Sequence, residues 1–99
     1  MIILPSALDD LKEVYTYVAD NADSGVADLY VNRIEAAMAN LVDFPFRGSP
    51  QDHLMADLRS ISFERRIRIF YLPREDSIEI ARVIHMSRDL GRIFEEYSD

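Results

Sequence analysis

The chain has 99 residues, of which 48% are hydrophobic, contains no cysteine and carries a formal net charge of −7. A chain of this length has room for one modest core, so residues 1–99 are expected to form a single domain without disulfides. No apolar run approaches the roughly 18 to 20 residues of a membrane span, and the apolar N-terminus is too short for a secretory signal, so we expect a cytoplasmic protein with no membrane contact.

The charges are unevenly distributed along the chain. Residues 1–58 carry ten acids against three basic residues, whereas residues 59–92 carry eight arginines against five acids. The acidic average argues against direct binding of nucleic acid, which requires a basic surface. Guanidinium groups form bidentate contacts with carboxylates and phosphates. The second half therefore either forms a recognition surface or carries charge that keeps strand edges soluble.

The N-terminal segment predicts a short strand followed by a helix. Residues 2–4 are apolar, and Pro5 should end the strand because it fixes its own φ. Ser6 is a candidate N-cap, with Asp9 three residues later as in a capping box, and a helix of about 13 residues should follow. Its apolar stripe comprises Leu8, Leu11, Val14, Tyr15 and Val18. The charged residues of this helix are expected to face water, namely Asp9, Asp10, Lys12 and Glu13.

A second helix should follow after a short turn. Residues 21–25 are a turn by composition, in which Asp23 or Ser24 can cap the next helix. Apolar residues recur every three or four positions from Val26 to Val42, which predicts a longer helix that forms an antiparallel hairpin with the first. The two prolines and one glycine of residues 43–50 should end it.

The rest of the chain predicts strands. Residues 51–57 show no period and are expected to form a loop, and residues 58–63 and 66–72 predict two strands separated by the two residues of a tight hairpin. Residues 77–85 predict a third strand. The fold class is therefore α+β: a short N-terminal strand and a helix hairpin packed on an antiparallel sheet with a three-stranded meander, and a short C-terminal helix. The sheet face opposite the hairpin is left for that last helix or for a partner.

Arg82 is the charged residue that most requires a partner, because Ile80 and Val83 flank it in an apolar strand. Burying a guanidinium costs several kcal/mol unless an acceptor meets it. The partner is either an acid of a helix, in an internal salt bridge, or a group outside the chain. Tyr71 alternates with Ile67 and Ile69 and is expected in the core.

The remaining chemistry predicts no cofactor and no metal, since neither His53 nor His85 has a carboxylate at metal-ligand spacing. A ribonuclease can work without a metal if cations stabilise the phosphorane and a histidine acts as acid or base. The residues available for that role are Arg59, Arg68, Arg82, His85 and Arg88. Alternatively, His85 forms a structural hydrogen bond at the end of its strand.

Several segments, in this order and spacing, resemble the RelE/ParE superfamily of toxins from bacterial type II toxin–antitoxin systems. They are Leu58-Arg59, Arg68 to Tyr71, Ile78 to His85 and Arg88-Asp89, with the first helix and residues 44–48 in support. The resemblance covers nearly the whole chain. RelE-like members cut mRNA on the ribosome with basic residues and often a tyrosine, whereas ParE-like members lack that set and poison DNA gyrase. No tyrosine follows Arg88 before Tyr97, and Lys12 is the one lysine, which favours ParE.

The resemblance implies a toxin associated with plasmid stabilisation that inhibits DNA gyrase, with the A subunit as the expected contact, through protein contact and not as an enzyme. It also implies a ParD-like antitoxin that neutralises the toxin in a hetero-oligomer and mediates any contact with DNA. The alternatives are a RelE-like mRNA endonuclease, which would be an enzyme, and a non-toxic interaction module. The predicted partner-binding residues are Arg59, Arg68, Arg82, His85, Arg88, Leu90, Ile93, Phe94 and Tyr97.

Overall fold

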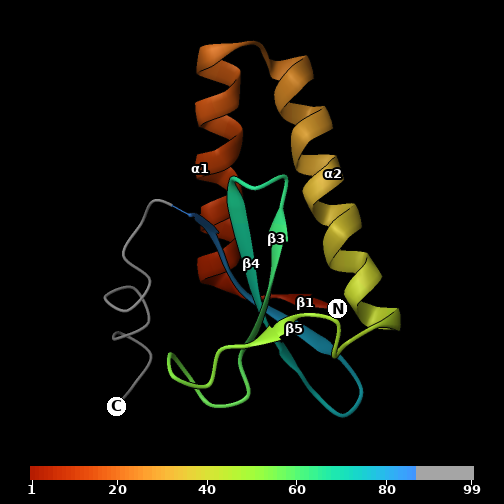
Figure 1. Cartoon of the computed structure of the whole chain (residues 1–99). Helices are drawn as coiled ribbons and strands as arrows, with labels where there is room; N and C mark the ends of the chain where they lie inside the picture. Colours follow the sequence, from red (N-terminus) through yellow and green to blue (C-terminus); the bar gives the residue numbers. More distant parts are fainter. Residues whose placement is uncertain (87–99) are drawn as a thin grey trace.

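The computed structural model describes residues 1–86. Their elements are β1 (Ile2–Ile3), α1 (Pro5–Asn21), α2 (Ser24–Asp43), β2 (Ser49–Pro50), β3 (Arg59–Phe63), β4 (Ile67–Pro73) and β5 (Ile78–His85). The strands form one sheet in the order β1-β5-β4-β3-β2, and α1 and α2 form an antiparallel hairpin beside it (Figure 1). The predicted α+β class, the helix hairpin and the meander of β3, β4 and β5 are confirmed.

The sheet differs from the prediction at both edges. β1 runs parallel to β5, with Ile2 opposite Glu79 and Ile3 opposite Ile80, so the sheet is mixed and not purely antiparallel. β2 pairs with β3 at the other edge. No pattern in the sequence indicates this strand, because two residues that include a proline show no alternation. The predicted C-terminal helix lies outside the described residues.

The helix ends show which capping predictions hold. α1 begins at Pro5 with Leu4 as its N-cap, so the prediction of Ser6 as the cap is wrong. Proline is favoured at the first helical position because its missing N–H would have no partner there. The helix then continues for 17 residues, beyond the predicted length. α2 begins after Asp23, whose carboxylate accepts a hydrogen bond from the Val26 N–H at 2.8 Å, as predicted.

The buried face of α1 is rotated relative to the predicted stripe. Ala7 and Leu11 are buried, whereas Leu8 is 46% exposed. The expectation that Asp10 faces water is wrong, since this residue is 6% exposed. Asp10 lies three residues after Ala7, which places both on the same face of the helix. This face packs toward β5, where Asp10 finds its partners.

The core has one part on each face of the sheet. The larger part lies between the helices and the sheet and comprises Ala7, Leu11, Ile34, Met38, Leu41, Ile67, Ile69, Tyr71, Ile78, Ile80 and Val83. The smaller part lies on the opposite face, because its members Phe70 and Leu72 alternate along β4 with those of the larger part. Leu54 and Met55, from the loop after β2, pack against it. This face is therefore partly filled by the chain itself.

The β3–β4 hairpin turns at Glu64 and Arg65, at the predicted position. Their φ values are 48° and 59°, and the Arg66 N–H donates to the Phe63 carbonyl at 3.1 Å. Positive φ at both central residues is the geometry that favours Asn-Gly, and a residue with a Cβ pays about 1 kcal/mol for it. Glu64 also pairs with Arg33 of α2, with contacts of 3.0 and 3.2 Å. That ion pair ties the hairpin tip to α2.

We expect Arg65→Gly to raise the free energy of unfolding by about 0.5–1 kcal/mol, because glycine adopts positive φ without steric strain. Urea denaturation followed by circular dichroism measures the change. Arg65→Ala is the matched control, since it removes the same charge but keeps the Cβ, and it should not stabilise the protein. Equal stabilisation by both variants would attribute the effect to charge and contradict strain in the turn.

Candidate functional site

A buried ion pair joins α1 to β5. The Asp10 carboxylate accepts hydrogen bonds from Arg82 Nε at 2.7 Å, from Arg82 Nη2 at 2.9 Å and from the Val83 backbone N–H at 2.9 Å. The two side chains are 8% and 14% exposed. Among the described residues, β1 pairs with β5 only as far as Ile80. The Asp10 carboxylate thus supplies the acceptor that a longer β1 would have offered to Val83.

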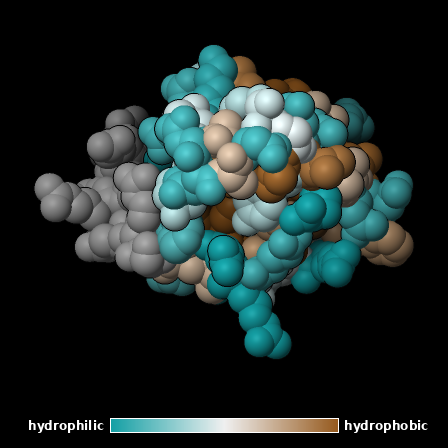
Figure 2. Space-filling view, turned by 90° about the horizontal axis from the view of Figure 1, so that it is seen from above, coloured by the Kyte–Doolittle hydropathy of each residue, from teal (hydrophilic) through white to brown (hydrophobic). Residues whose placement is uncertain are grey.

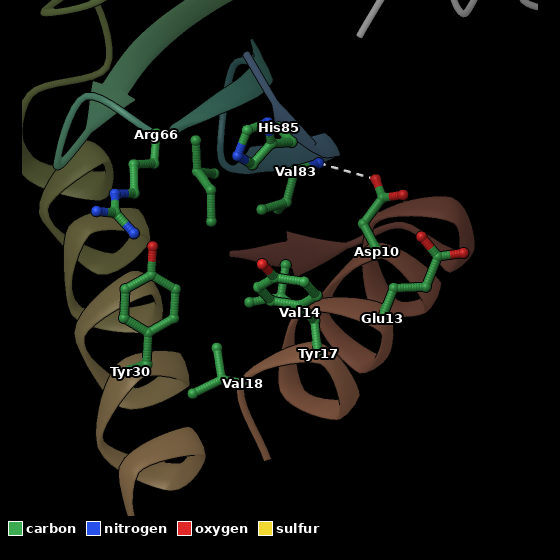
Figure 3. Close-up of a pocket in the computed structure, with 10 residues that line it drawn as sticks. Asp10, Glu13, Val14, Tyr17, Val18, Tyr30, Arg66, Val83 and His85 are labelled. Atoms are coloured by element: carbon green, nitrogen blue, oxygen red, sulfur yellow. Dashed lines mark hydrogen bonds between the residues drawn. The ribbon is translucent and has the colours of Figure 1, made fainter. Parts of the chain in front are cut away.

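A pocket of about 600 Å³ lies beside this ion pair, between the helix hairpin, the start of β4 and the end of β5. It is lined by Asp10, Glu13, Val14, Tyr17, Val18, Tyr30, Arg66, Ile67, Val83 and His85. Figure 3 shows Tyr17 and Tyr30 on facing helices, with Arg66 and His85 coming from the strands toward the same space. From above, Figure 2 shows apolar surface recessed among hydrophilic side chains at this end of the molecule. We call this the hairpin pocket.

The rim of the hairpin pocket includes an available cation. Arg66 is exposed, and its guanidinium forms no hydrogen bond or ion pair with any residue in the described range 1–86. Burial raises the pKa of the neighbouring Tyr30 above its usual 10.0, the Glu64 carboxylate raises it further, and Arg66 acts in the opposite direction. Tyr30 therefore keeps its hydroxyl proton into alkaline pH and remains a hydrogen-bond donor beside Arg66.

Contacts with the β3–β4 hairpin hold Tyr30 in place. Its ring packs edge-on against Phe63, with 5.6 Å between the ring centroids. The Arg33 guanidinium lies 5.3 Å from the centroid of the Tyr30 ring and pairs with Glu64. The hydrogen bond to Glu64 raises the pKa of Arg33. The α2 wall of the pocket is therefore fixed to the sheet by an aromatic contact and an ion pair.

The arginines suggested by the sequence do not gather at one point. Arg59 is paired with Tyr71, so it belongs to the helix-covered face, whereas Arg68 has the opposite alternation and belongs to the other face. Arg59 also donates to the carbonyls of Phe46 at 3.2 Å and Gly48 at 2.6 Å. Arg68 is half-buried, and its guanidinium forms no hydrogen bond or ion pair with any of residues 1–86.

The remaining predicted residues fall into three groups. Arg82 pairs with Asp10 of α1. Of the two alternatives for Arg82, the internal salt bridge to an acid of a helix is the one observed. His85 is exposed at the end of β5 and lines the hairpin pocket. The others lie outside the described residues, so their role in partner binding stays a prediction: Arg88, Leu90, Ile93, Phe94 and Tyr97.

Two features of the site were not predicted from the sequence. Asp10, the acceptor for Arg82, was expected to face water. Ala7, Asp10 and Leu11 follow the i, i+3, i+4 pattern of one helical face, and this pattern indicates that Asp10 lies on the buried face. The pocket itself combines Tyr30 with Arg66, which are 36 positions apart in the chain. No spacing in the sequence brings them together, because their proximity depends on how the hairpin tip docks on α2.

The chemistry of the hairpin pocket suits binding of a peptide side chain. It offers buried apolar surface at Ile67 and Val83, two phenols, and the Arg66 guanidinium, which has no ion-pair partner among residues 1–86. Within residues 1–86, no three side chains of the types His, Asp and Glu are grouped so as to hold a metal ion. Neither α1 nor α2 is long and apolar enough to cross a membrane.

Two comparisons with known proteins agree. A family model described as ParE toxin of type II toxin-antitoxin system, parDE, matches residues 1–90. A solved structure described as "Chromosomal ParDE TA system from P. aeruginosa" is similar with a TM-score of 0.73 and 20% sequence identity, covering 86% of this chain and 95% of that one. At that identity the likeness shows the fold. No curated protein sequence matches the chain.

Proposed function

The chain belongs to the ParE toxin family of type II toxin–antitoxin systems, and we propose that it inhibits DNA gyrase through protein contact. We further propose that it acts as one cytoplasmic domain, that a cognate antitoxin neutralises it in a hetero-oligomer, and that any contact with DNA passes through the antitoxin. The family match over residues 1–90 carries this proposal.

The arrangement of the arginines supports protein contact over RNA cleavage. A metal-independent ribonuclease needs cations aimed at one phosphate, together with an acid and a base within reach of it. Among the described residues, Arg59 and Arg68 belong to opposite faces of the sheet, and Arg82 pairs with Asp10. The net charge of −7 also disfavours direct contact with RNA.

A paired assay on the purified, antitoxin-free protein tests the proposal. Gyrase supercoiling and gyrase-dependent DNA cleavage are measured in one set of reactions, and ribosome-dependent mRNA cleavage in another. We expect inhibited supercoiling and intact mRNA. Cut mRNA with normal gyrase would replace the proposal with an endonuclease, and activity in neither assay would indicate a non-toxic interaction module.

The hairpin pocket is our candidate for the antitoxin contact. Its apolar lining suits an aliphatic or aromatic anchor, and the available guanidinium of Arg66 suits a carboxylate next to that anchor. His85 lines this pocket, whereas Arg68 lies at the same end of β4 but on the opposite face of the sheet. We propose that both contact the antitoxin, which would reach Arg68 by extending past this end of the sheet. Arg59 and Arg82 have partners within the chain, so we expect them to contribute mainly by positioning.

We expect Arg66→Glu to weaken antitoxin binding by about tenfold or more, because it replaces attraction to a carboxylate with repulsion at a partly desolvated rim. Isothermal titration calorimetry with the purified antitoxin measures the change. Arg65→Glu makes the same change of charge at the neighbouring residue, which does not line the pocket, and should weaken binding by about threefold or less. Similar losses for both variants would show only a long-range charge effect.

A further inference from the structure

A turn after α2 exposes two aromatic side chains. Phe44 and Phe46 are 59% and 70% exposed. The Arg47 N–H donates to the Phe44 carbonyl at 3.2 Å and closes the turn, with Pro45 at the second position, where its fixed φ is favoured. Exposed phenylalanines in pairs are unusual on a free surface and are typical of protein interfaces.

The turn is held by contacts to neighbouring elements. Arg47 Nη1 donates to Asn40 Oδ1 at 2.6 Å, and the Gly48 N–H donates to the buried Tyr71 hydroxyl at 2.8 Å. The Arg59 guanidinium lies 5.1 Å from the centroid of the Phe46 ring and donates to the Phe46 carbonyl. The rings are thus presented by a backbone with fixed hydrogen bonds, which lowers the entropy cost of binding a partner.

Phe46 separates two hollows in the surface. One, of about 600 Å³, lies between Phe44 and Phe46 and is predominantly apolar. The other, of about 200 Å³, lies on the far side of Phe46 and is bordered by Asp52 and Asp57. A partner that straddles Phe46 would place an apolar side chain in the first hollow and a polar one in the second.

The charge around Phe46 selects the kind of partner. Both Asp52 and Asp57 are exposed, and neither carboxylate pairs with a cation in the described part of the chain. Arg59 also lines this hollow, but its guanidinium is directed at the carbonyls of Phe46 and Gly48, so the two carboxylates outnumber it there. The whole chain carries a net charge of −7, which attracts basic partners from a distance. The second hollow therefore suits a lysine or arginine.

We propose that Phe44, Phe46, Asp52 and Asp57 form the surface that binds the toxin's target protein, through a segment in which a lysine or arginine adjoins a large apolar residue. We call it the Phe46 surface. The inference rests on the proposed function, and it names the contact chemistry of the target. The hairpin pocket has the opposite preference, for an acidic segment at Arg66.

The two surfaces lie toward opposite ends of α2. Tyr30 lines the hairpin pocket near the start of the helix, and Phe44 follows its last residue. Fourteen residues at about 1.5 Å each separate them by roughly 20 Å along the helix axis. One side chain of a partner cannot reach both. Substitutions at the Phe46 surface should therefore separate target action from antitoxin binding.

The experiment compares Phe46→Ser with the wild-type chain in inhibition of purified DNA gyrase, in growth arrest on expression and in antitoxin binding. We expect about a tenfold loss of gyrase inhibition, loss of growth arrest, and antitoxin affinity within twofold of wild type. Leu29→Ser is the matched control, since it removes a 63% exposed apolar side chain at the other end of α2, and it should leave inhibition within twofold. Circular dichroism verifies that each variant is folded.

A charge variant tests the second hollow. Asp52→Asn with Asp57→Asn removes both charges but keeps the acceptor for the Asp57 N–H and suits the φ of 66° at residue 57. We expect a loss of inhibition of at least fivefold that shrinks as salt is raised.

The outcomes separate this inference from the proposed function. Full gyrase inhibition by folded Phe46→Ser, or joint loss of inhibition and antitoxin binding, would overturn the inference alone. A wild-type chain that arrests growth without affecting gyrase would overturn the gyrase proposal. Loss of that arrest in Phe46→Ser would then still support the Phe46 surface.

Discussion

Asp10→Ala should lower the free energy of unfolding by about 3–5 kcal/mol, because it removes the carboxylate that forms two hydrogen bonds with a largely buried guanidinium. The Asp10 carboxylate accepts three hydrogen bonds from Arg82 and Val83, and both side chains of the ion pair are largely excluded from water. A small domain has about 5–15 kcal/mol of stability in total, so the variant should be close to unfolding at 37 °C. Urea denaturation at 15–25 °C measures the difference.

Asp9→Ala is the matched control for this prediction. It removes the same charge from the adjacent residue of α1, which is exposed, and should change stability by about 0.5 kcal/mol or less. The double variant Asp10→Ala/Arg82→Ala should be more stable than the sum of the two single losses predicts, since removing both partners leaves no uncompensated charge. Equal destabilisation by Asp9→Ala and Asp10→Ala would contradict the importance of the pair.

Gly48→Ala should lower the free energy of unfolding by about 2–3 kcal/mol, because an added methyl group has no space there. Its Cβ would lie 2.6 Å from the Tyr71 hydroxyl oxygen and 2.7 Å from the Ser60 carbonyl oxygen. The Ser60 carbonyl belongs to the backbone of β3, paired on both sides in the sheet, so it cannot move aside. The hydrogen bond from the Gly48 N–H to Tyr71 should be strained or lost as well.

The control for Gly48 is the helical glycine, Gly25. A Cβ at that position meets only the Asp23 carboxylate at 3.2 Å, and alanine is favoured over glycine in a helix. Gly25→Ala should therefore change stability by less than about 1 kcal/mol, as measured by thermal unfolding, because the higher helix propensity of alanine offsets crowding of the Asp23 cap. A Gly48→Ala variant as stable as the wild-type chain would mean that β2 and its turn can shift without loss.

The fold could be predicted where the apolar residues recur with the period of a helix or a strand. Helical spacing marked both helices, and alternation with a two-residue break marked β3 and β4. The edges could not be predicted in the same way. β2 consists of two residues that include Pro50, and the parallel pairing of β1 depends on how α1 packs against β5. Neither carries a local signal, because both are determined by packing between distant segments.

The candidate site was predicted only in part. The flanking apolar residues showed that Arg82 needs an acceptor, but not whether that acceptor lies within the chain or outside it. The ion pair with Asp10 answers this question. Arg59 and Arg68 were grouped by residue type, whereas the register of β3 and β4 assigns them to opposite faces. The sequence alone identified a charged residue that needs a partner. It did not show which way each side chain points, because that depends on how the strands pair.

The contacts between the two ends of the described chain have a consequence for the timing of folding. β1 pairs with residues 79–80, and Asp10 holds Arg82 and Val83, so the first ten residues close their contacts with a segment made more than 65 residues later. At about 5–20 residues per second, several seconds of translation separate the two segments. During that interval α1 and α2 can form, but the parallel edge cannot close. A nascent toxin should therefore lack its completed sheet until β5 has left the ribosome.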